Sequence, residues 1–124
     1  MRRVFITRSF ARWLGKTDLG VEALCKAIEE MERGLVDAKL GGGIEKKRIA
    51  LPGRCKRGSA RTLIATNSLD RWFFVFGFEK NDRDNIDANE KALKSLAADL
   101  LRLYVAQIQN AVATNRLHEI CHEN

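Results

Sequence analysis

The sequence predicts an α+β domain in which a small, mainly antiparallel sheet of four strands packs against two N-terminal helices and a C-terminal helix. Apolar residues recur with a helical period between residues 18 and 33 and again between residues 87 and 108. Between them, residues 61–66 and 72–78 form short runs rich in β-branched and aromatic residues. The 124 residues suffice to bury one core, so a single domain over residues 1–124 is expected.

The N-terminal third predicts one strand and two helices. Residues 3–7 (RVFIT) are strong strand formers, and residues 9–15 predict a short helix. Asp18 is the expected N-cap of a longer helix that runs to Arg33 and ends at Gly34. Its buried face is predicted from the spacing of Val21, Leu24, Cys25, Ile28 and Met31.

The remaining elements follow from turn residues and periodicity. Three consecutive glycines at 41–43 predict a turn before a strand over residues 44–51, and Pro52-Gly53 marks the next turn. Residues 67–70 predict a hairpin, and the strand at 72–78 is apolar on both faces, which favours a central place in the sheet. The spacing of Asp87 and Glu90 resembles a capping box that opens the last helix, whose apolar side extends to Ile108.

Positive charge is concentrated in two segments. The formal net charge is +6 at pH 7. Residues 46–61 hold seven Lys or Arg, residues 1–16 hold five, and neither segment has an acidic residue. Such clusters favour a polyanionic partner such as a nucleic-acid backbone. Taken alone, the longer cluster is equally consistent with a surface loop exposed only to solvent.

The cysteines and the lack of targeting signals predict a cytoplasmic location. Cys25, Cys55 and Cys121 are odd in number and widely spaced, which indicates no disulfide framework and favours a reducing compartment. The sequence shows neither a signal peptide nor an apolar run of membrane-spanning length, so no membrane partner is expected. Cys25 is expected to pack in the core, whereas Cys55, between two basic residues, is expected to have thiolate character.

Basic residues around the two central strands are the candidate catalytic groups. Lys56 and Arg57 precede Arg61, which opens the first strand, while Lys80 and Arg83 follow the second. Antiparallel pairing brings these ends together, so we expect convergence at one edge of the sheet. Such a cluster suits phosphoryl transfer, because cations neutralise charge on the phosphate oxygens, a crowded Lys can act as a base, and RNA supplies its own 2′-hydroxyl. For Arg61 alone, a structural salt bridge or a passive phosphate contact fits equally well.

A second candidate site lies near the C-terminus. His118, Cys121 and His122 form the sequence HEICH, which suggests a metal site. A stable site of this kind needs a fourth ligand on a fixed framework, so a polar tail is the favoured interpretation and no metal or cofactor is expected.

Two segments resemble a known family. GGGIEKKRIALPGRCKRGSARTLIA and RWFFVFGFEKNDRDNI are similar to the RelE/HigB-like toxins of bacterial type II toxin–antitoxin systems, and to a subgroup with the patterns KRxAxPGxGKxGGxRTxVA and FFxxGFxKNxRDNI. The resemblance is good over residues 41–86 and loose over the whole chain. It implies a RelE-like fold and a ribosome-dependent mRNA endoribonuclease that inhibits translation. It also implies mRNA and ribosome as partners and a cognate antitoxin, often of the helix-turn-helix type.

The resemblance also implies roles for individual residues. Arg61 matches the strand arginine that contacts the scissile phosphate, Lys56 matches the loop lysine before it, and Lys80 and Arg83 match the basic pair after the last strand. The remaining cations of the longer cluster are expected to contact RNA or the ribosome, namely Lys46, Lys47, Arg48, Arg54 and Arg57.

The chain departs from the family pattern at several positions. Ala60 stands where the subgroup usually has an aromatic or bulky residue, and Cys55 and Ser59 replace glycines. No Tyr or His follows the last strand, so the general acid and base are not identified by the resemblance. Two other functions stay open: a non-hydrolytic toxin that acts by binding, for example to gyrase, and a plain nucleic-acid-binding module.

Overall fold

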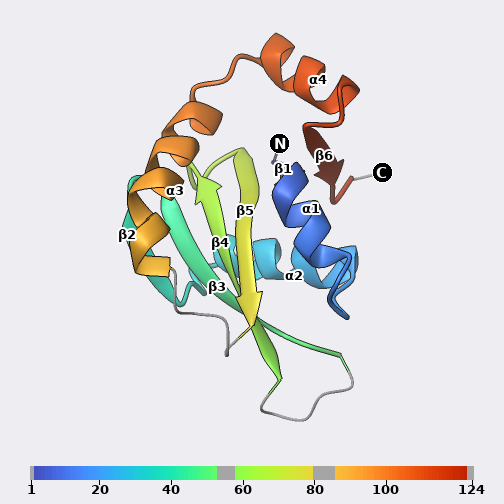
Figure 1. Cartoon of the computed structure of the whole chain (residues 1–124), viewed down its shortest axis with the longest axis vertical. Helices are drawn as coiled ribbons and strands as arrows, with labels where there is room; N and C mark the ends of the chain where they lie inside the picture. The colour runs from blue at the N-terminus through green and yellow to red at the C-terminus, as the bar shows by residue number, and fades with distance from the viewer. Residues whose placement is uncertain (1, 53–57, 80–85, 123–124) are drawn as a thin grey trace.

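The computed structural model describes residues 2–52, 58–79 and 86–122, with the side chains of residues 86–89 excepted. The elements follow one another along the chain as β1 (Arg3–Thr7), α1 (Arg8–Leu14), α2 (Val21–Glu32), β2 (Ala38–Gly41), β3 (Ile44–Ala50), β4 (Ser59–Thr66), β5 (Arg71–Glu79), α3 (Ile86–Leu101), α4 (Val105–Ala113) and β6 (Leu117–Ile120). Figure 1 shows the helices arranged around one continuous sheet.

The sheet has six strands in the order β2-β3-β4-β5-β1-β6. The four predicted strands are present, and β5 lies between β4 and β1, which confirms its predicted central position. The predicted strand count is wrong, because β2 and β6 extend the sheet at its two edges. The sheet is also mixed, since β1 runs parallel to β5 while the other pairs are antiparallel.

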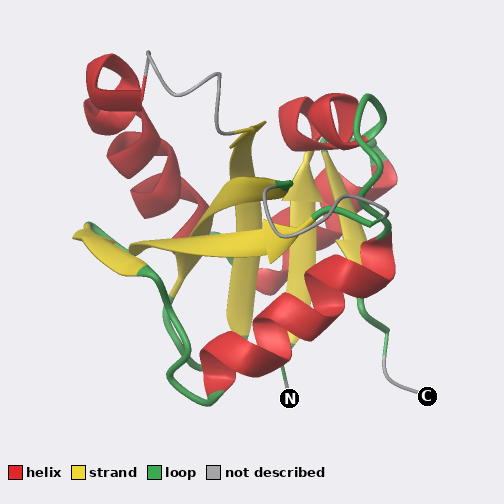
Figure 2. Cartoon of the chain, turned by 90° about the horizontal axis from the view of Figure 1, so that it is seen from below, coloured by secondary structure: helices red, strands yellow, loops and turns green. Residues whose placement is uncertain are grey.

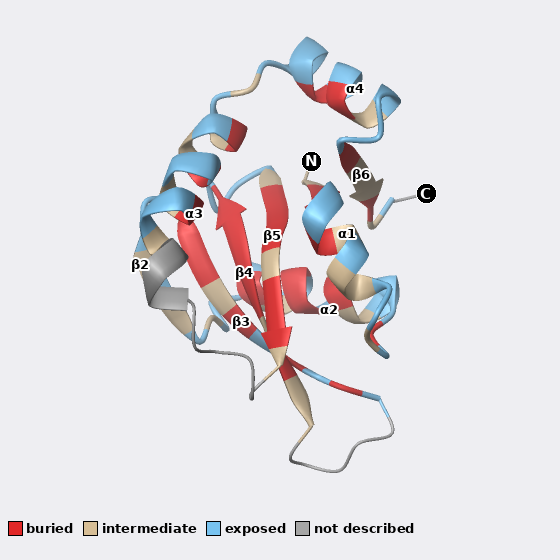
Figure 3. Cartoon of the chain, in the orientation of Figure 1, coloured by how far each residue is buried: buried red, intermediate tan, exposed pale blue. Residues whose placement is uncertain are grey.

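Helices cover both faces of the sheet (Figure 2). On one face, buried side chains of α1 and α2, among them Phe10 and Ile28, pack with Ile64 and Phe74. The other face packs against α3 and α4, whose buried residues include Leu93 and Ile108. The two N-terminal helices therefore share one face, as the sequence predicted. Figure 3 shows burial concentrated in the central strands, which are covered on both sides.

The predicted start of the first long helix is wrong. The first long helix begins at Val21 after the N-cap Gly20, not after Asp18, because the Thr17 hydroxyl accepts a hydrogen bond from Leu19 N–H at 3.2 Å and holds a turn there. Its predicted end at Gly34 is confirmed by a left-handed φ of 89°.

The last predicted helix is two helices. α3 ends at Leu101 and α4 starts at Val105. The Arg71 guanidinium donates to the Leu103 carbonyl between them, and the Tyr104 N–H is capped by the Gln107 side chain at 2.8 Å. These polar contacts satisfy the backbone groups that the break exposes. The predicted turn at residues 41–43 is present, with φ between 64° and 84° at all three glycines.

A disulfide joins Cys25 of α2 to Cys121 just after β6, across 96 residues of sequence. The prediction of no disulfide is therefore wrong for this pair. Sequence spacing gave no signal for it, because the two cysteines meet only when β6 pairs with β1 at the sheet edge. The same edge carries a forked ion pair, in which the Arg3 guanidinium donates to both oxygens of Glu119 at 2.9 Å.

Among the described residues, no helix is both long and apolar enough to cross a membrane.

Candidate functional site

Three cations lie on the α3 face of the sheet and are called here the cationic row: Lys46, Arg48 and Arg61. Arg48 of β3 stands directly opposite Arg61 of β4, and Arg61 stands opposite Phe78 of β5. Strand residues alternate between faces, so Arg61 shares its face with Leu63, which packs into the α3 core. Like charges directly opposite each other on neighbouring strands destabilise a sheet. An anionic ligand would remove that cost.

Arg61 is the most unusual member of the cationic row. Its side chain is half-buried, and its Nη1 atom is buried without a hydrogen-bond partner. Within residues 2–52, 58–79 and 86–122, no carboxylate forms an ion pair with Arg61, Arg48 or Lys46. A buried guanidinium nitrogen without an acceptor costs free energy and is rare in folded proteins. The arrangement is therefore suited to bind an external anion such as a phosphate.

Lys47 has a structural role that the sequence did not predict. Its side chain points to the α2 face, where its Nζ contacts Glu30 Oε1 at 2.9 Å and donates to the Leu35 carbonyl at 2.8 Å. The hydrogen bond from Lys47 lowers the pKa of the Glu30 carboxyl below its usual value. Only 10% of the Lys47 side chain is exposed. The geometry therefore argues against the predicted RNA contact by Lys47, since its neighbours Lys46 and Arg48 face the opposite way.

The other predicted site residues lie outside the described residues: Arg54, Cys55, Lys56, Arg57, Lys80 and Arg83. The strand ends next to them are described. Ala50 pairs with Ser59, and Ala60 pairs with Glu79. The described ends of β3, β4 and β5 that flank the two basic segments are therefore neighbours in the sheet.

An aromatic pocket of about 380 Å³ lies between α1 and the end of β5. It is lined by Trp13 of α1 and by Phe76 and Phe78 of β5. Gly77 permits this packing, because a Cβ atom there would lie 2.4 Å from the Trp13 ring. Phe78 belongs both to this pocket and to the register row of Arg61. Sequence reasoning assigned no site role to Trp13, and its only signal was an aromatic residue in a short helix.

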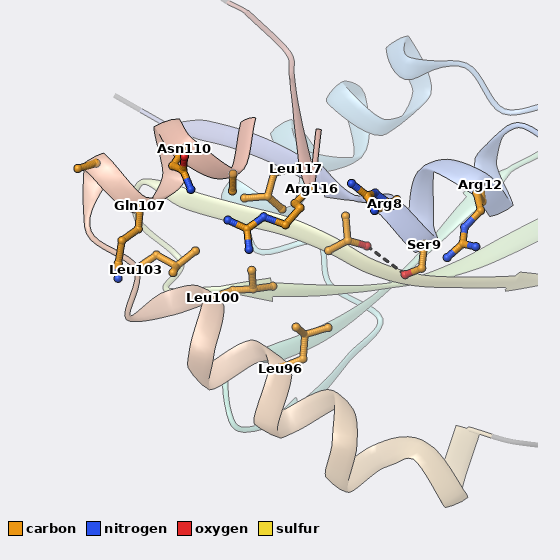
Figure 4. Close-up of a pocket in the computed structure, with 13 residues that line it drawn as sticks. Arg8, Ser9, Arg12, Leu96, Leu100, Leu103, Gln107, Asn110, Arg116 and Leu117 are labelled. Atoms are coloured by element: carbon orange, nitrogen blue, oxygen red, sulfur yellow. Dashed lines mark hydrogen bonds between the residues drawn. The ribbon is translucent and has the colours of Figure 1, made fainter. Parts of the chain in front are cut away.

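A second, larger pocket of about 830 Å³, called here the α3–α4 groove, lies between α1, α3 and α4 (Figure 4). Leucines of α3 and the following loop form one wall, and Arg8, Arg12 and Arg116 lie on the other. Sequence analysis missed this groove, because its lining comes from segments about 90 residues apart that meet only in the folded chain.

Two residues of the C-terminal HEICH segment, which suggested a metal site, make contacts within the protein. Glu119 is held by Arg3, and the Cys121 sulfur is part of the disulfide and not a free thiolate. In the described part of the chain, no group of three His, Cys, Asp or Glu side chains is placed to hold a metal ion.

Comparison with known proteins identifies the family. A search of curated proteins found no match. The family model described as the RelE toxin of the RelE/RelB toxin–antitoxin system matches residues 2–120. That match covers nearly the whole chain, from β1 to β6, and includes the cationic row. The chain therefore belongs to the RelE toxin family of RelE/RelB toxin–antitoxin systems.

Proposed function

We propose that this RelE-family toxin is an endoribonuclease that cleaves mRNA on the ribosome and thereby stops translation and growth. The observation that carries the proposal is Arg61, which stands directly opposite Arg48 and whose guanidinium Nη1 atom is buried without a hydrogen-bond partner. Neither guanidinium group has a carboxylate partner among the described residues. Two such adjacent groups suit a phosphodiester, whose oxygens accept forked hydrogen bonds. The aromatic pocket, which includes Phe78, the register partner of Arg61, supplies ring faces on which a neighbouring base can stack.

The chemistry proposed is transfer within the RNA backbone. The 2′-oxygen forms a bond to the adjacent phosphorus while the bond from phosphorus to the 5′-oxygen breaks, which leaves a 2′,3′-cyclic phosphate and a 5′-hydroxyl. Arg61 neutralises the negative charge that grows on the phosphate oxygens. A base removes the 2′-hydroxyl proton, and an acid delivers a proton to the departing 5′-oxygen.

The cations next to the described strand ends complete the proposed site. Lys56 precedes β4, the strand that contains Arg61. Lys80 and Arg83 follow β5, whose last residue Glu79 pairs with Ala60, the neighbour of Arg61 in the sequence. Lys56 is proposed as the base, because nearby positive charges lower the pKa of a Lys ammonium. Arg54 and Arg57, together with Lys46 and Arg48, are proposed to hold the RNA or ribosomal backbone.

Membership in the family implies a cognate RelB-type antitoxin as partner. We further propose that this antitoxin is a helix-turn-helix protein, and that the toxin works in the cytoplasm, where translating ribosomes are found. The disulfide would then be reduced during much of the working life of the protein.

Two assays on the purified chain test the proposal. One follows the cleavage of a defined mRNA by primer extension on translating ribosomes, and the other follows DNA supercoiling by gyrase. We expect Arg61→Ala to lose mRNA cleavage. The control Lys39→Ala should keep it, because Lys39 is an exposed cation on the opposite face of the sheet. Inhibition of supercoiling without mRNA cleavage would refute the endoribonuclease proposal in favour of a toxin that acts by binding.

A further inference from the structure

The disulfide between Cys25 and Cys121 joins two residues that are half-buried, so neither is enclosed in the core. Exposed disulfides are the ones that small thiols open readily, whereas structural disulfides resist them. In the cytoplasm, which the proposed function assigns to this toxin, thiols are kept reduced, and the disulfides that do occur are mostly transient and serve redox sensing or catalysis. The position of this pair therefore favours a disulfide that opens and closes.

The backbone of Cys121 gives a second reason for a labile disulfide. Its φ is 60°, in the left-handed region that residues with a Cβ atom rarely adopt. β6 ends at Ile120, and the chain turns at Cys121, where the disulfide ties it to α2. Such a backbone conformation persists only where its surroundings impose it. The disulfide is one such constraint, so the closed form carries a conformational cost that the open form can release.

The disulfide fastens a C-terminal unit, defined here as α4, β6 and the turn between them, residues 105–120. β6 is a four-residue edge strand that pairs with β1, and Figure 1 shows α4 and β6 at the periphery of the fold. α4 has nine residues, fewer than a helix needs to be stable by itself. The unit therefore stays folded through contacts with the rest of the protein, among them the buried Ile108 and Leu117 and the fork between Arg3 and Glu119. Segments held in this way are the ones that open locally.

We propose that Cys25 and Cys121 form a redox-modification site that a low-molecular-weight disulfide such as glutathione disulfide closes and that glutathione opens. In the closed form the C-terminal unit is tied to α2, and in the open form it unfolds locally while the rest of the sheet stays intact. This inference rests on the proposed function only for the cytoplasmic location. β5 and β1 lie between β6 and the strand that contains Arg61, so the site is separate from the cationic row.

Closure is a two-electron oxidation of the two protein thiols. One cysteine thiolate attacks glutathione disulfide, so that a bond forms between its sulfur and one glutathione sulfur while the other glutathione leaves as a thiolate. The second cysteine thiolate then attacks the protein sulfur of this mixed disulfide, which forms the bond between Cys25 and Cys121 and releases the second glutathione thiolate. The two protons of the cysteine thiols pass to the two glutathione thiolates. One glutathione disulfide is thereby reduced to two glutathione molecules, and opening is the reverse reaction.

A redox titration of the purified full chain tests the site. The probe is a series of buffers in which the ratio of glutathione to glutathione disulfide runs from strongly reducing to strongly oxidising. Free thiols are trapped by alkylation, and peptide mass spectrometry reads the state of each cysteine. Cys55→Ser keeps the pair and is the control for the third cysteine, whereas Cys121→Ser cannot close. We expect the parent and Cys55→Ser to pass from open to closed within the series.

Hydrogen exchange followed by mass spectrometry tests what the site controls. Backbone amides of the C-terminal unit should exchange about tenfold faster or more in the open parent and in Cys121→Ser than in the closed parent. Amides of the central strands β4 and β5 should change much less. Circular dichroism should show the same folded sheet in all of these chains.

Four outcomes would refute the proposal. A pair that stays closed in the most reducing buffer is a permanent structural disulfide, and a pair that stays open in the most oxidising buffer is no redox site. Equal exchange of the C-terminal unit in both forms would show that the pair does not control it, and equal acceleration in β4 and β5 would show global unfolding. None of these measurements involves mRNA, so a chain that titrates as expected yet cleaves no mRNA would overturn the proposed endoribonuclease and leave the redox site intact.

Discussion

Replacing Arg61 with alanine should abolish most mRNA cleavage without destabilising the fold. Replacing a residue that only stabilises the structure would instead destabilise the fold and leave cleavage by the folded protein unchanged. Arg61 lies directly opposite Arg48, and its Nη1 atom is buried without a partner. Both features cost stability in the free protein, so this residue is poorly explained by folding alone.

The two costs set the expected magnitudes. Removing a like-charge pair between adjacent strands should gain roughly 0.2–1 kcal/mol, and removing an unsatisfied buried polar atom should gain about 1 kcal/mol or more. Loss of the packed alkyl stem offsets part of this gain. The free energy of unfolding of Arg61→Ala should therefore equal that of the parent or exceed it by about 1 kcal/mol. Cleavage should fall about 10²-fold or more, as happens when a charge-stabilising donor is removed.

Urea unfolding followed by circular dichroism measures the first quantity, and mRNA cleavage on translating ribosomes measures the second. Arg61→Lys should recover only part of the activity, because a point charge cannot replace the planar guanidinium fork. The reasoning would be refuted if Arg61→Ala lost more than about 1 kcal/mol of stability while it cleaved mRNA at the parental rate. Arg61 would then be a structural residue, and the anion site would have to be sought elsewhere.

Three further predictions concern how Lys47, the ion pair of Glu119 with Arg3, and the disulfide contribute to stability. Lys47→Met should lower the free energy of unfolding by about 1 kcal/mol, because it removes the ion pair with Glu30 and the hydrogen bond to the Leu35 carbonyl, yet it should leave cleavage unchanged. Hydrogen bonds from Arg3 lower the pKa of the Glu119 carboxyl. The ion pair between them should stabilise the fold fully above 4.5, the pKa of this carboxyl in the unfolded chain. That contribution should be lost as the pH falls through the lower pKa of the folded state. Reducing the disulfide between α2 and the end of β6 should cost up to about 4–5 kcal/mol, because it closes a long loop.

Each of these predictions has its own control. Lys46→Met removes a neighbouring cation from the other face of β3 and should leave stability almost unchanged, so equal losses for the two lysine variants would contradict the role of Lys47. Arg3→Gln should flatten the decline of stability below pH 4.5, and an unchanged decline would exclude this ion pair as its source. A Cys25→Ser/Cys121→Ser variant should be insensitive to reductant. A parent chain equally insensitive under the same conditions would show that the disulfide does not contribute to stability.

The sequence by itself determined the local elements and the family. Helical periods located α2 and α3, β-forming runs located β1, β3, β4 and β5, and the glycines at 41–43 marked the turn before β3. These features depend on side-chain spacing and backbone preference, which neighbouring residues set. The motif around Arg61 was sufficient to indicate the RelE family, which the match over residues 2–120 confirmed.

Only the tertiary structure decided how distant segments meet. β2 and β6 are four residues long, too short for a periodic signal, and they become strands because the sheet edges supply hydrogen-bond partners. The parallel pairing of β1 with β5, the Cys25–Cys121 disulfide and the contact of Lys47 with Glu30 join residues that the local pattern leaves unconnected. The same holds for the α3–α4 groove. Packing across the whole fold sets such contacts, so the groove and the contacts of Lys47 became visible only in three dimensions.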